Sequence, residues 1–248
     1  EEDVRAFALP ILRHRVLTNY HAESDGQSVD DVLRTGDDQV LILSGDASSL
    51  VGETVEARVE RPARLATQAN HTATHLLHAA LRQRLGSHVR QAGSSVAPDK
   101  LRFDFTHGEA LSDADIAAVE DEVNARILEG SDVGWRETTL DEAKSLGAMA
   151  LFGEKYGEVV RLVEIGDGSF SRELCGGTHV GNTAEIGVFR IVSEGSSAAN
   201  VRRIEAVTGP VAIDLLRRHD QALRMAATNL RTTPEDVPVA LAKREARL

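Results

Sequence analysis

Hydrophobic and polar residues alternate with a period of two, or form short apolar runs, in the first part of the chain. The segments QVLILSG at 39–45 and ETVEARVER at 53–61 show this pattern, and Gly, Asp and Ser residues flank them. Short segments of this kind between turn residues are typical of β-strands. Because Pro62 then interrupts the pattern, we expect a β-rich part over residues 1–62 that ends near this proline.

Helical periodicity begins after this point and alternates with strand patterns towards the C-terminus. From Leu65 apolar residues recur at helical spacing as far as Gly86, a residue type that commonly ends helices. A second amphipathic helix follows Ser112, a favourable N-cap. Strands are expected at 101–107, 159–166, 186–195 and 201–207, and helices beyond Pro210 and again near Thr233. This order predicts an α+β fold, with a mixed helix-and-sheet core at 63–209 and a helical segment at 210–248.

Composition is that of an ordinary globular protein and narrows its expected location. Of 248 residues, 42% are hydrophobic and 27% are charged, which allows a substantial core. No apolar run approaches the roughly 20 residues of a membrane span, and the N-terminus has no signal-peptide pattern. A single cysteine cannot form an internal disulfide, which favours the cytoplasm. The net charge of −11 argues weakly against a broad basic surface for nucleic acid. The start at Glu1 is compatible both with a piece of a longer protein and with a free-standing one.

Two pairs of metal-binding residue types stand out, each with a spacing of four. In HTATH, His71 and His75 lie within the helical pattern, and this spacing puts both imidazoles on one helix face about 5–6 Å apart. In CGGTH, Cys175 and His179 flank two glycines, which make a helix improbable there and let the backbone turn tightly. Three nitrogens and one sulfur form a typical tetrahedral zinc set. The sequence therefore predicts one Zn²⁺ bound by His71, His75, Cys175 and His179.

Neighbouring residues limit the chemistry of this site. His78 lies on the same helix face as His75, and we expect it to pack or to support a ligand rather than bind the metal. The first pair contains no glutamate, as it would in the HExxH motif of metalloproteases. The nearest acidic residue to the second pair is Glu173, which would share a strand face with Cys175. A hydrolase for small esters or amides is therefore disfavoured.

Five segments around these pairs resemble the editing domain of alanyl-tRNA synthetase. They are NHTATHLLHAALRQRLGSHVRQAGS at 70–94, LRFDFTH at 101–107, GAMALFGEKYG at 147–157, SRELCGGTHV at 171–180 and VRRIEAVTG at 201–209. The resemblance spans about residues 64–209 in the order of the family. The related second domain of threonyl-tRNA synthetase shares the two metal pairs, but it lacks the glycine pair of CGGTH and the GAMALFGEKYG segment.

The resemblance implies a fold and an activity. It implies a small β-barrel in the N-terminal part, followed by the editing core and the start of the arm that leads to the C-terminal domain of a synthetase. The implied reaction is hydrolysis of tRNA(Ala) wrongly charged with serine or glycine. The implied partners are the acceptor end of that tRNA and the rest of a synthetase chain, since an aminoacylation module is missing. A free-standing editing protein is the other form that the family takes.

The resemblance and the residue types also suggest which side chains meet the substrate. A pocket built for alanine discriminates weakly against glycine and serine, so an editing site must recognise the serine hydroxyl positively. Thr72, Gln91 and Ser94 are candidates for that recognition, and Gln91 matches a position that lines the editing pocket of the family. The segment HAESDGQ at 21–27 resembles a family motif that has Gly in place of Asp25, and this carboxylate would repel phosphate near Gln27. Arg202 and Arg203 are candidates for phosphate contacts, although strand alternation places them on opposite faces.

The sequence allows three roles for a zinc ion. Zinc could activate water, polarise the ester carbonyl or orient the amino group of the substrate. Four protein ligands normally describe a closed structural site, whereas catalytic zinc keeps one position open. We expect Cys175 to be the ligand whose loss most damages turnover. The alternatives are a tRNA acceptor-end binding module with a purely structural zinc, and a non-enzymatic scaffold that no feature of the sequence supports.

Overall fold

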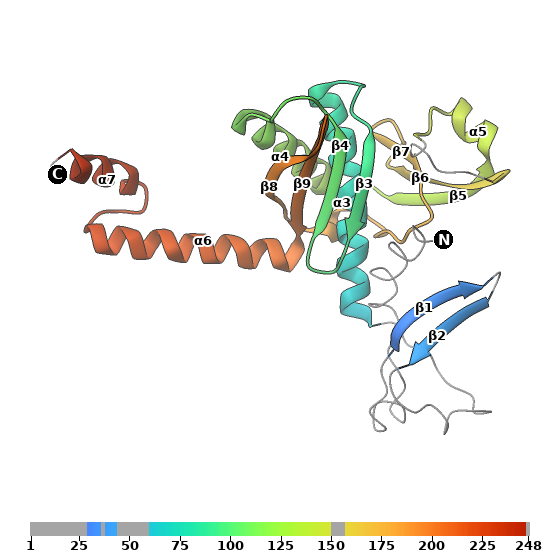
Figure 1. Ribbon diagram of the computed structural model, residues 1–248, viewed down its shortest axis with the longest axis horizontal. Coiled ribbons are helices and arrows are strands. Elements are labelled where there is room, and N and C mark those ends of the chain that lie inside the picture. Colours follow the sequence, from blue (N-terminus) through green and yellow to red (C-terminus); the bar gives the residue numbers. More distant parts are fainter. Residues whose placement is uncertain (1–28, 36–37, 44–59, 150–156, 247–248) are drawn as a thin grey trace.

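A computed structural model describes residues 29–35, 38–43, 60–149 and 157–246 of the chain. In these ranges helices pack against antiparallel sheets, and a long helix projects from one side (Figure 1). No helix within them is both long and apolar enough to cross a membrane.

Three separate antiparallel sheets are present in the described ranges. The main sheet has the order β3-β4-β9-β8, formed by Gln91–Val96, Leu101–Thr106, Val201–Thr208 and Phe189–Ala198. The second has the order β5-β6-β7, formed by Val133–Thr139, Val159–Ile165 and Ser171–Leu174. A two-stranded sheet joins β1, Val29–Thr35, to β2, Asp38–Leu43. The rest of the predicted barrel over 1–62 lies outside the described residues.

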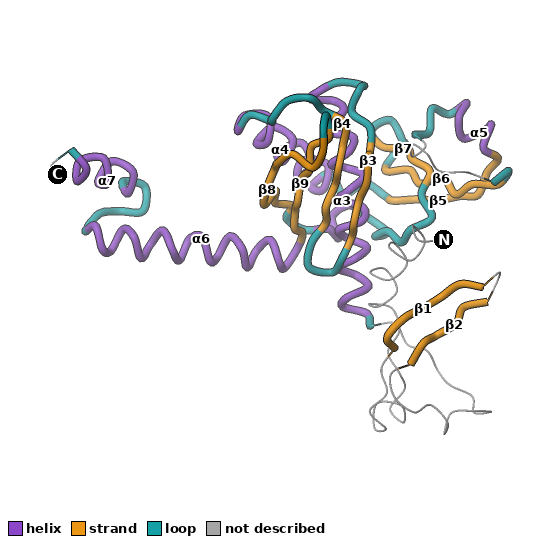
Figure 2. Tube along the Cα trace, viewed as in Figure 1, coloured by secondary structure: helices purple, strands orange, loops and turns teal. Residues whose placement is uncertain are grey.

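Helix α3, Arg61–Leu85, is the central element of the core. It begins with a proline in its first turn and ends at Gly86, whose φ of 116° is unfavourable for other residues. Its middle, from Thr67 to Leu81, is almost entirely buried, because the main sheet, helix α4 and the segment after β7 all pack around it (Figure 2). This burial fixes the side chains of the HTATH motif in the interior of the protein.

Helix α4, Asp113–Leu128, covers α3 on one side. Ser112 caps its first turn through a reciprocal capping box with Asp115, which confirms the predicted N-cap. Its apolar face is buried at Val119, Val123 and Ile127. Short helices complete the core: α5 is Leu140–Ser145 and the 3-10 helix η2 is Thr183–Ile186.

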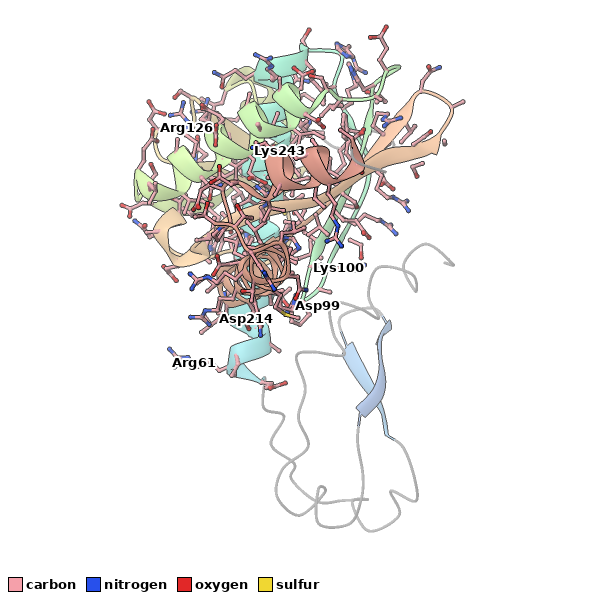
Figure 3. All side chains as sticks on the ribbon, turned by 90° about the vertical axis from the view of Figure 1, so that its left-hand side faces the viewer. Arg61, Asp99, Lys100, Arg126, Asp214 and Lys243 are labelled. Atoms are coloured by element: carbon pink, nitrogen blue, oxygen red, sulfur yellow. The ribbon has the colours of Figure 1, made fainter. Side chains whose placement is uncertain are left out.

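The C-terminal segment is helical, as predicted, but most of its first helix does not pack against the core. Helix α6, Gly209–Leu230, leaves the main sheet and leads to α7, Val237–Glu245. Only three residues of α6 are buried, and in the view along its axis side chains surround it, Asp214 among them (Figure 3). This helix is an extension of the fold rather than part of its core.

Strand predictions are confirmed where the pattern is apolar and fail where it is polar. Strands β4, β6, β8 and β9 overlap the predicted segments, although β8 begins three residues later than expected because η2 occupies 183–186. Strands β3 and β5 were not predicted, since each buries a single side chain, Val96 and Thr138 respectively. Pairing with β4 and β6 produces these two strands.

Candidate metal centre

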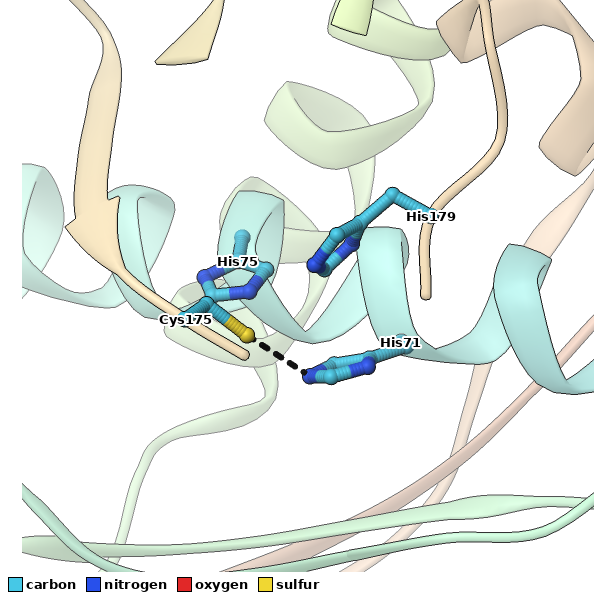
Figure 4. A group of neighbouring side chains, drawn as sticks. All are labelled: His71, His75, Cys175 and His179. Atoms are coloured by element: carbon cyan, nitrogen blue, oxygen red, sulfur yellow. Dashed lines mark hydrogen bonds between the residues drawn. The ribbon is translucent and has the colours of Figure 1, made fainter. Parts of the chain in front are cut away.

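The two predicted pairs meet in one cluster. His71 and His75 project from α3, and Cys175 and His179 come from the segment that follows β7 (Figure 4). One donor atom from each residue lies within 4.8 Å of the other three, and Sγ of Cys175 is 3.4 Å from Nε2 of His71. The rings of His71 and His179 are 4.4 Å apart between centroids. The spacing in sequence is therefore matched by convergence in space.

The donor set and its surroundings fit zinc. Bond lengths of about 2.0–2.3 Å to zinc put the donors of a tetrahedron roughly 3.3–3.8 Å apart, which agrees with the distance between sulfur and Nε2. Nε2 of His75 and Nε2 of His179 are buried and have no hydrogen-bond partner among the described residues. A buried nitrogen without a partner is costly unless it binds something else. A metal ion between these atoms would satisfy both.

Glu173 forms hydrogen bonds with two histidines of α3, His75 and His78. Its Oε2 is 2.8 Å from Nδ1 of His75, and its Oε1 is 3.1 Å from Nδ1 of His78. The carboxylate is only 3% exposed, so water screens these interactions very little. A carboxylate on Nδ1 fixes the ring orientation of a metal-binding histidine and leaves Nε2 for the metal. His75, His78 and Glu173 thus form one hydrogen-bonded group, in which His78 supports Glu173.

Thr72 performs a similar task for His179. Its side chain is fully buried, and its hydroxyl donates to the carbonyl of Gln68 at 3.0 Å and accepts from the backbone N–H of Val180 at 3.2 Å. The same oxygen is 3.3 Å from Nδ1 of His179. The Thr72 hydroxyl is therefore engaged by the backbone and lies against the imidazole of His179.

Electrostatics favour the metal-binding form of the cysteine. Burial raises the pKa of the Cys175 thiol, but the three neighbouring imidazoles of His179, His71 and His75 stabilise the thiolate and lower this pKa to about 2. Burial lowers the pKa of His75, yet the charge of Glu173 raises it overall to about 10. Burial is also the main reason why the pKa of His179 falls to about 4. The cluster thus combines a thiolate, a neutral histidine and a histidine whose extra proton must leave before a metal binds.

The two glycines of CGGTH have different roles. A β-carbon on Gly177 would overlap the imidazole of His71, whereas one on Gly176 would meet nothing within 4 Å. Neither glycine has a positive φ. The segment is non-helical as expected. Position 177 has room only for glycine because the imidazole of His71 lies so close to it, and not because the backbone needs a special turn there.

The remaining predicted site residues belong to strands of the main sheet or lie outside the described residues. Gln91 and Ser94 are both on β3, where Nε2 of Gln91 donates to Oγ of Ser94 at 3.0 Å. Arg202 is paired with Glu194 through bonds of 2.6 and 2.7 Å, and Arg203 with Asp104 through bonds of 2.7 and 2.8 Å. Both arginines are thus already neutralised by carboxylates. Gln27 lies outside the described residues.

Sequence reasoning missed a cavity of about 280 Å³ beside the cluster. His179 forms part of its wall, together with Trp135 of β5, Arg161 of β6 and Arg64 of α3. The guanidinium carbon of Arg161 is 4.3 Å from the centre of the Trp135 ring. A lone tryptophan in a polar segment was the only signal for it in the sequence.

Comparison with known proteins identifies the domain family that part of this chain matches. Residues 160–205, which include most of β6, all of β7 and the CGGTH segment, match the second additional domain of threonyl and alanyl tRNA synthetases. The chain is 48% identical over 247 residues to alanine–tRNA ligase of Bordetella petrii, with 93% of this chain and 28% of the ligase covered. It is 47% identical over 235 residues to the ligase of Acetivibrio thermocellus, with 88% and 26% covered.

The matches to the two ligases show to which part of a larger enzyme this chain is related. It is homologous to the editing-domain region of alanine–tRNA ligases, as the resemblance in sequence predicted. It spans little more than a quarter of the length of these relatives.

Proposed function

We propose that this chain hydrolyses the ester of tRNA(Ala) mischarged with serine or glycine, at a zinc ion bound by His71, His75, Cys175 and His179. The observation that carries the proposal is the convergence of four zinc-type donors in a homologue of the alanine–tRNA ligase editing region. The partners would be the acceptor end of tRNA and the rest of a synthetase chain, in the cytoplasm. Residues 63–209 would form the editing core, between the β-rich part and the helical arm.

The residues of the chain divide the work. When bound, zinc supplies positive charge that attracts the electron-rich atoms of the ester and its amino acid. Glu173 and Thr72 keep His75 and His179 in their binding orientation. Because the Thr72 hydroxyl is buried and engaged, we assign it this positioning role in place of direct recognition of serine.

Recognition of the serine hydroxyl falls to Gln91 and Ser94 in this proposal. Their mutual hydrogen bond fixes the amide of Gln91 on strand β3, so its oxygen remains available to accept from a hydroxyl. A site that hydrogen-bonds a substrate hydroxyl discriminates far better than an apolar pocket, which cannot strongly reject an added hydroxyl. Serine is therefore the substrate that this pair favours over alanine. Arg202 and Arg203 remain candidates for phosphate only if tRNA displaces their carboxylate partners.

A single-turnover assay on Ser-, Gly- and Ala-tRNA(Ala) tests the proposal. We expect hydrolysis of the serine and glycine esters, little hydrolysis of the alanine ester, and loss of activity in metal-free protein. Cys175→Ala should reduce turnover to the metal-free rate, whereas His219→Ala, which removes an exposed histidine of α6, should not. Full deacylation by the Cys175 variant would contradict the assigned role of the cysteine.

A binding module with a structural zinc is the second candidate. It is favoured by one observation: four protein donors converge, which is the ligand number of a closed zinc site. In the same assay such a module would bind tRNA but show no hydrolysis above the metal-free control. A general hydrolase is less well supported, because the nearby carboxylate of Glu173 is already held by two histidines.

A further inference from the structure

We infer that the cavity beside His179 binds the phosphorylated 3′-terminal nucleotide of the substrate, with its base on Trp135 and its phosphate on Arg64. This inference rests on the proposed function and adds a binding site to it. The cavity is close to the lower end of the roughly 300–1,000 Å³ that ligand pockets span, which suits one nucleotide rather than a larger ligand.

The charge of the cavity suits an anion. Its wall contains two arginines, Arg64 and Arg161, and no aspartate or glutamate, although the whole chain has a net charge of −11. Arg202 and Arg203 each face a carboxylate, but the guanidinium of Arg64 has no ion-pair partner among the described residues. Arg64 is therefore a better phosphate contact than either arginine that the sequence suggested.

The aromatic wall suits a base. Trp135 is 60% exposed, which is unusual for a large ring in a paired strand. Arg161 covers one face of the indole because the two residues are diagonal neighbours across the β5–β6 pair. Bases bind readily to aromatic rings of this kind, independently of sequence.

The same wall is tied to the metal cluster. Arg161 donates from one guanidinium nitrogen to the carbonyl of Gly177 at 2.6 Å, and its own carbonyl accepts from the backbone N–H of Cys175 at 3.1 Å. The hydrogen bond to Gly177 fixes the guanidinium that covers the Trp135 ring relative to the CGGTH segment. A base on Trp135 would thus be held at a fixed position relative to the cluster.

The two ends of the cavity match the two ends of a terminal nucleotide. Arg64 precedes His71 by seven residues, so both lie on the same face of α3 and are separated by about 10 Å of rise. A ligand that fills the space between them presents one end to the cluster and the other to Arg64. An aminoacylated nucleotide has that form, with the ester at one end and the 5′ phosphate at the other.

Trp135 makes the inference directly measurable, because it is the only tryptophan of the chain. The zinc-loaded 248-residue protein is titrated with the RNA trinucleotide CCA, with adenosine and with inorganic phosphate, and tryptophan fluorescence is recorded. We expect saturable quenching by the trinucleotide, weaker binding of adenosine and no quenching by phosphate. Arg64→Gln should weaken trinucleotide binding about ten-fold or more. Arg217→Gln, which removes an exposed arginine of α6, should leave it unchanged.

Calorimetry covers the aromatic variants, which lack the fluorescent ring. Trp135→Leu should weaken trinucleotide binding about 5- to 150-fold, the factor that corresponds to one base–aromatic stack, and Trp135→Phe should restore part of it. Unaltered binding by Arg64→Gln, or no fluorescence change at millimolar trinucleotide, would overturn the inference. Deacylation of Ser-tRNA(Ala) is measured on the same preparations. Hydrolysis without quenching refutes the cavity alone, whereas quenching without hydrolysis supports the cavity and refutes the proposed reaction.

Discussion

Replacing Glu173 by glutamine tests how the protein holds its metal-binding histidines. The carboxylate contacts His75 and His78 at 2.8 and 3.1 Å and is 3% exposed. A charge-assisted hydrogen bond contributes about 1.5–3 kcal/mol and a neutral one about 0.5–1.5 kcal/mol. Two bonds that lose their charge therefore weaken the support of the site by about 2–3 kcal/mol.

Zinc affinity should fall accordingly. Removal of a carboxylate behind a metal-binding histidine typically costs about 10- to 100-fold in affinity, or about 1.4–2.7 kcal/mol, which agrees with the hydrogen-bond figure. One effect acts in the opposite direction: Glu173 also raises the pKa of His75 to about 10, so a proton competes with zinc for that ring. We expect the loss to prevail, because the cost of about 10- to 100-fold is a net change in affinity that already includes proton competition of this kind.

Competition with a chromogenic chelator at pH 7.5 measures this affinity. Glu137→Gln is the matched control, since Glu137 is an exposed residue of β5, and it should bind zinc as the unaltered protein does. Equal or tighter zinc binding by Glu173→Gln would refute the reasoning, because it would mean that proton competition outweighs the support of the ligand.

Two further predictions follow from the geometry and charges of the cluster. Gly177→Ala should reduce the zinc content well below one ion per chain after dialysis, because its methyl group overlaps a ligand ring, whereas Gly176→Ala, whose methyl group meets nothing within 4 Å, should stay loaded; metal analysis of both variants decides this. Zinc binding at pH 7.5 should release about one proton, from His75, whose pKa is raised to about 10, and not from the thiol, whose pKa is lowered to about 2. Calorimetry in buffers of different ionisation enthalpy measures this release, and two protons, or an unchanged value in Glu173→Gln, would contradict the assigned protonation states.

Local patterns in the sequence were sufficient to predict several of the helices and strands of this protein and the pairing of its clustered histidines. The four-residue spacing of His71 and His75 predicts two imidazoles on one helix face, because helix geometry depends only on nearby residues. Apolar alternation located β4, β6, β8 and β9, and Ser112 marked the start of α4. The segments around both metal pairs were sufficient to identify the homology that the comparisons confirm.

Tertiary structure decided how these parts work together. Strands β3 and β5 have polar sequences, and only their partners in the sheet make them strands. No spacing could show that Glu173 contacts two histidines that precede it by almost a hundred residues, or that the Thr72 hydroxyl lies against His179.

The arginines show the same difference between what the sequence indicates and what the tertiary structure decides. Arg202 and Arg203 were attractive in sequence because adjacent arginines suggest a phosphate site, but their carboxylate partners come from other strands. Arg64 gave no signal in the sequence, and folding places it in the wall of a cavity without acidic residues. Residue type and spacing along one element set which chemistry is available, whereas contacts between distant elements determine which side chains are free to use it. Those contacts depend on how the whole chain packs, which a local pattern does not contain.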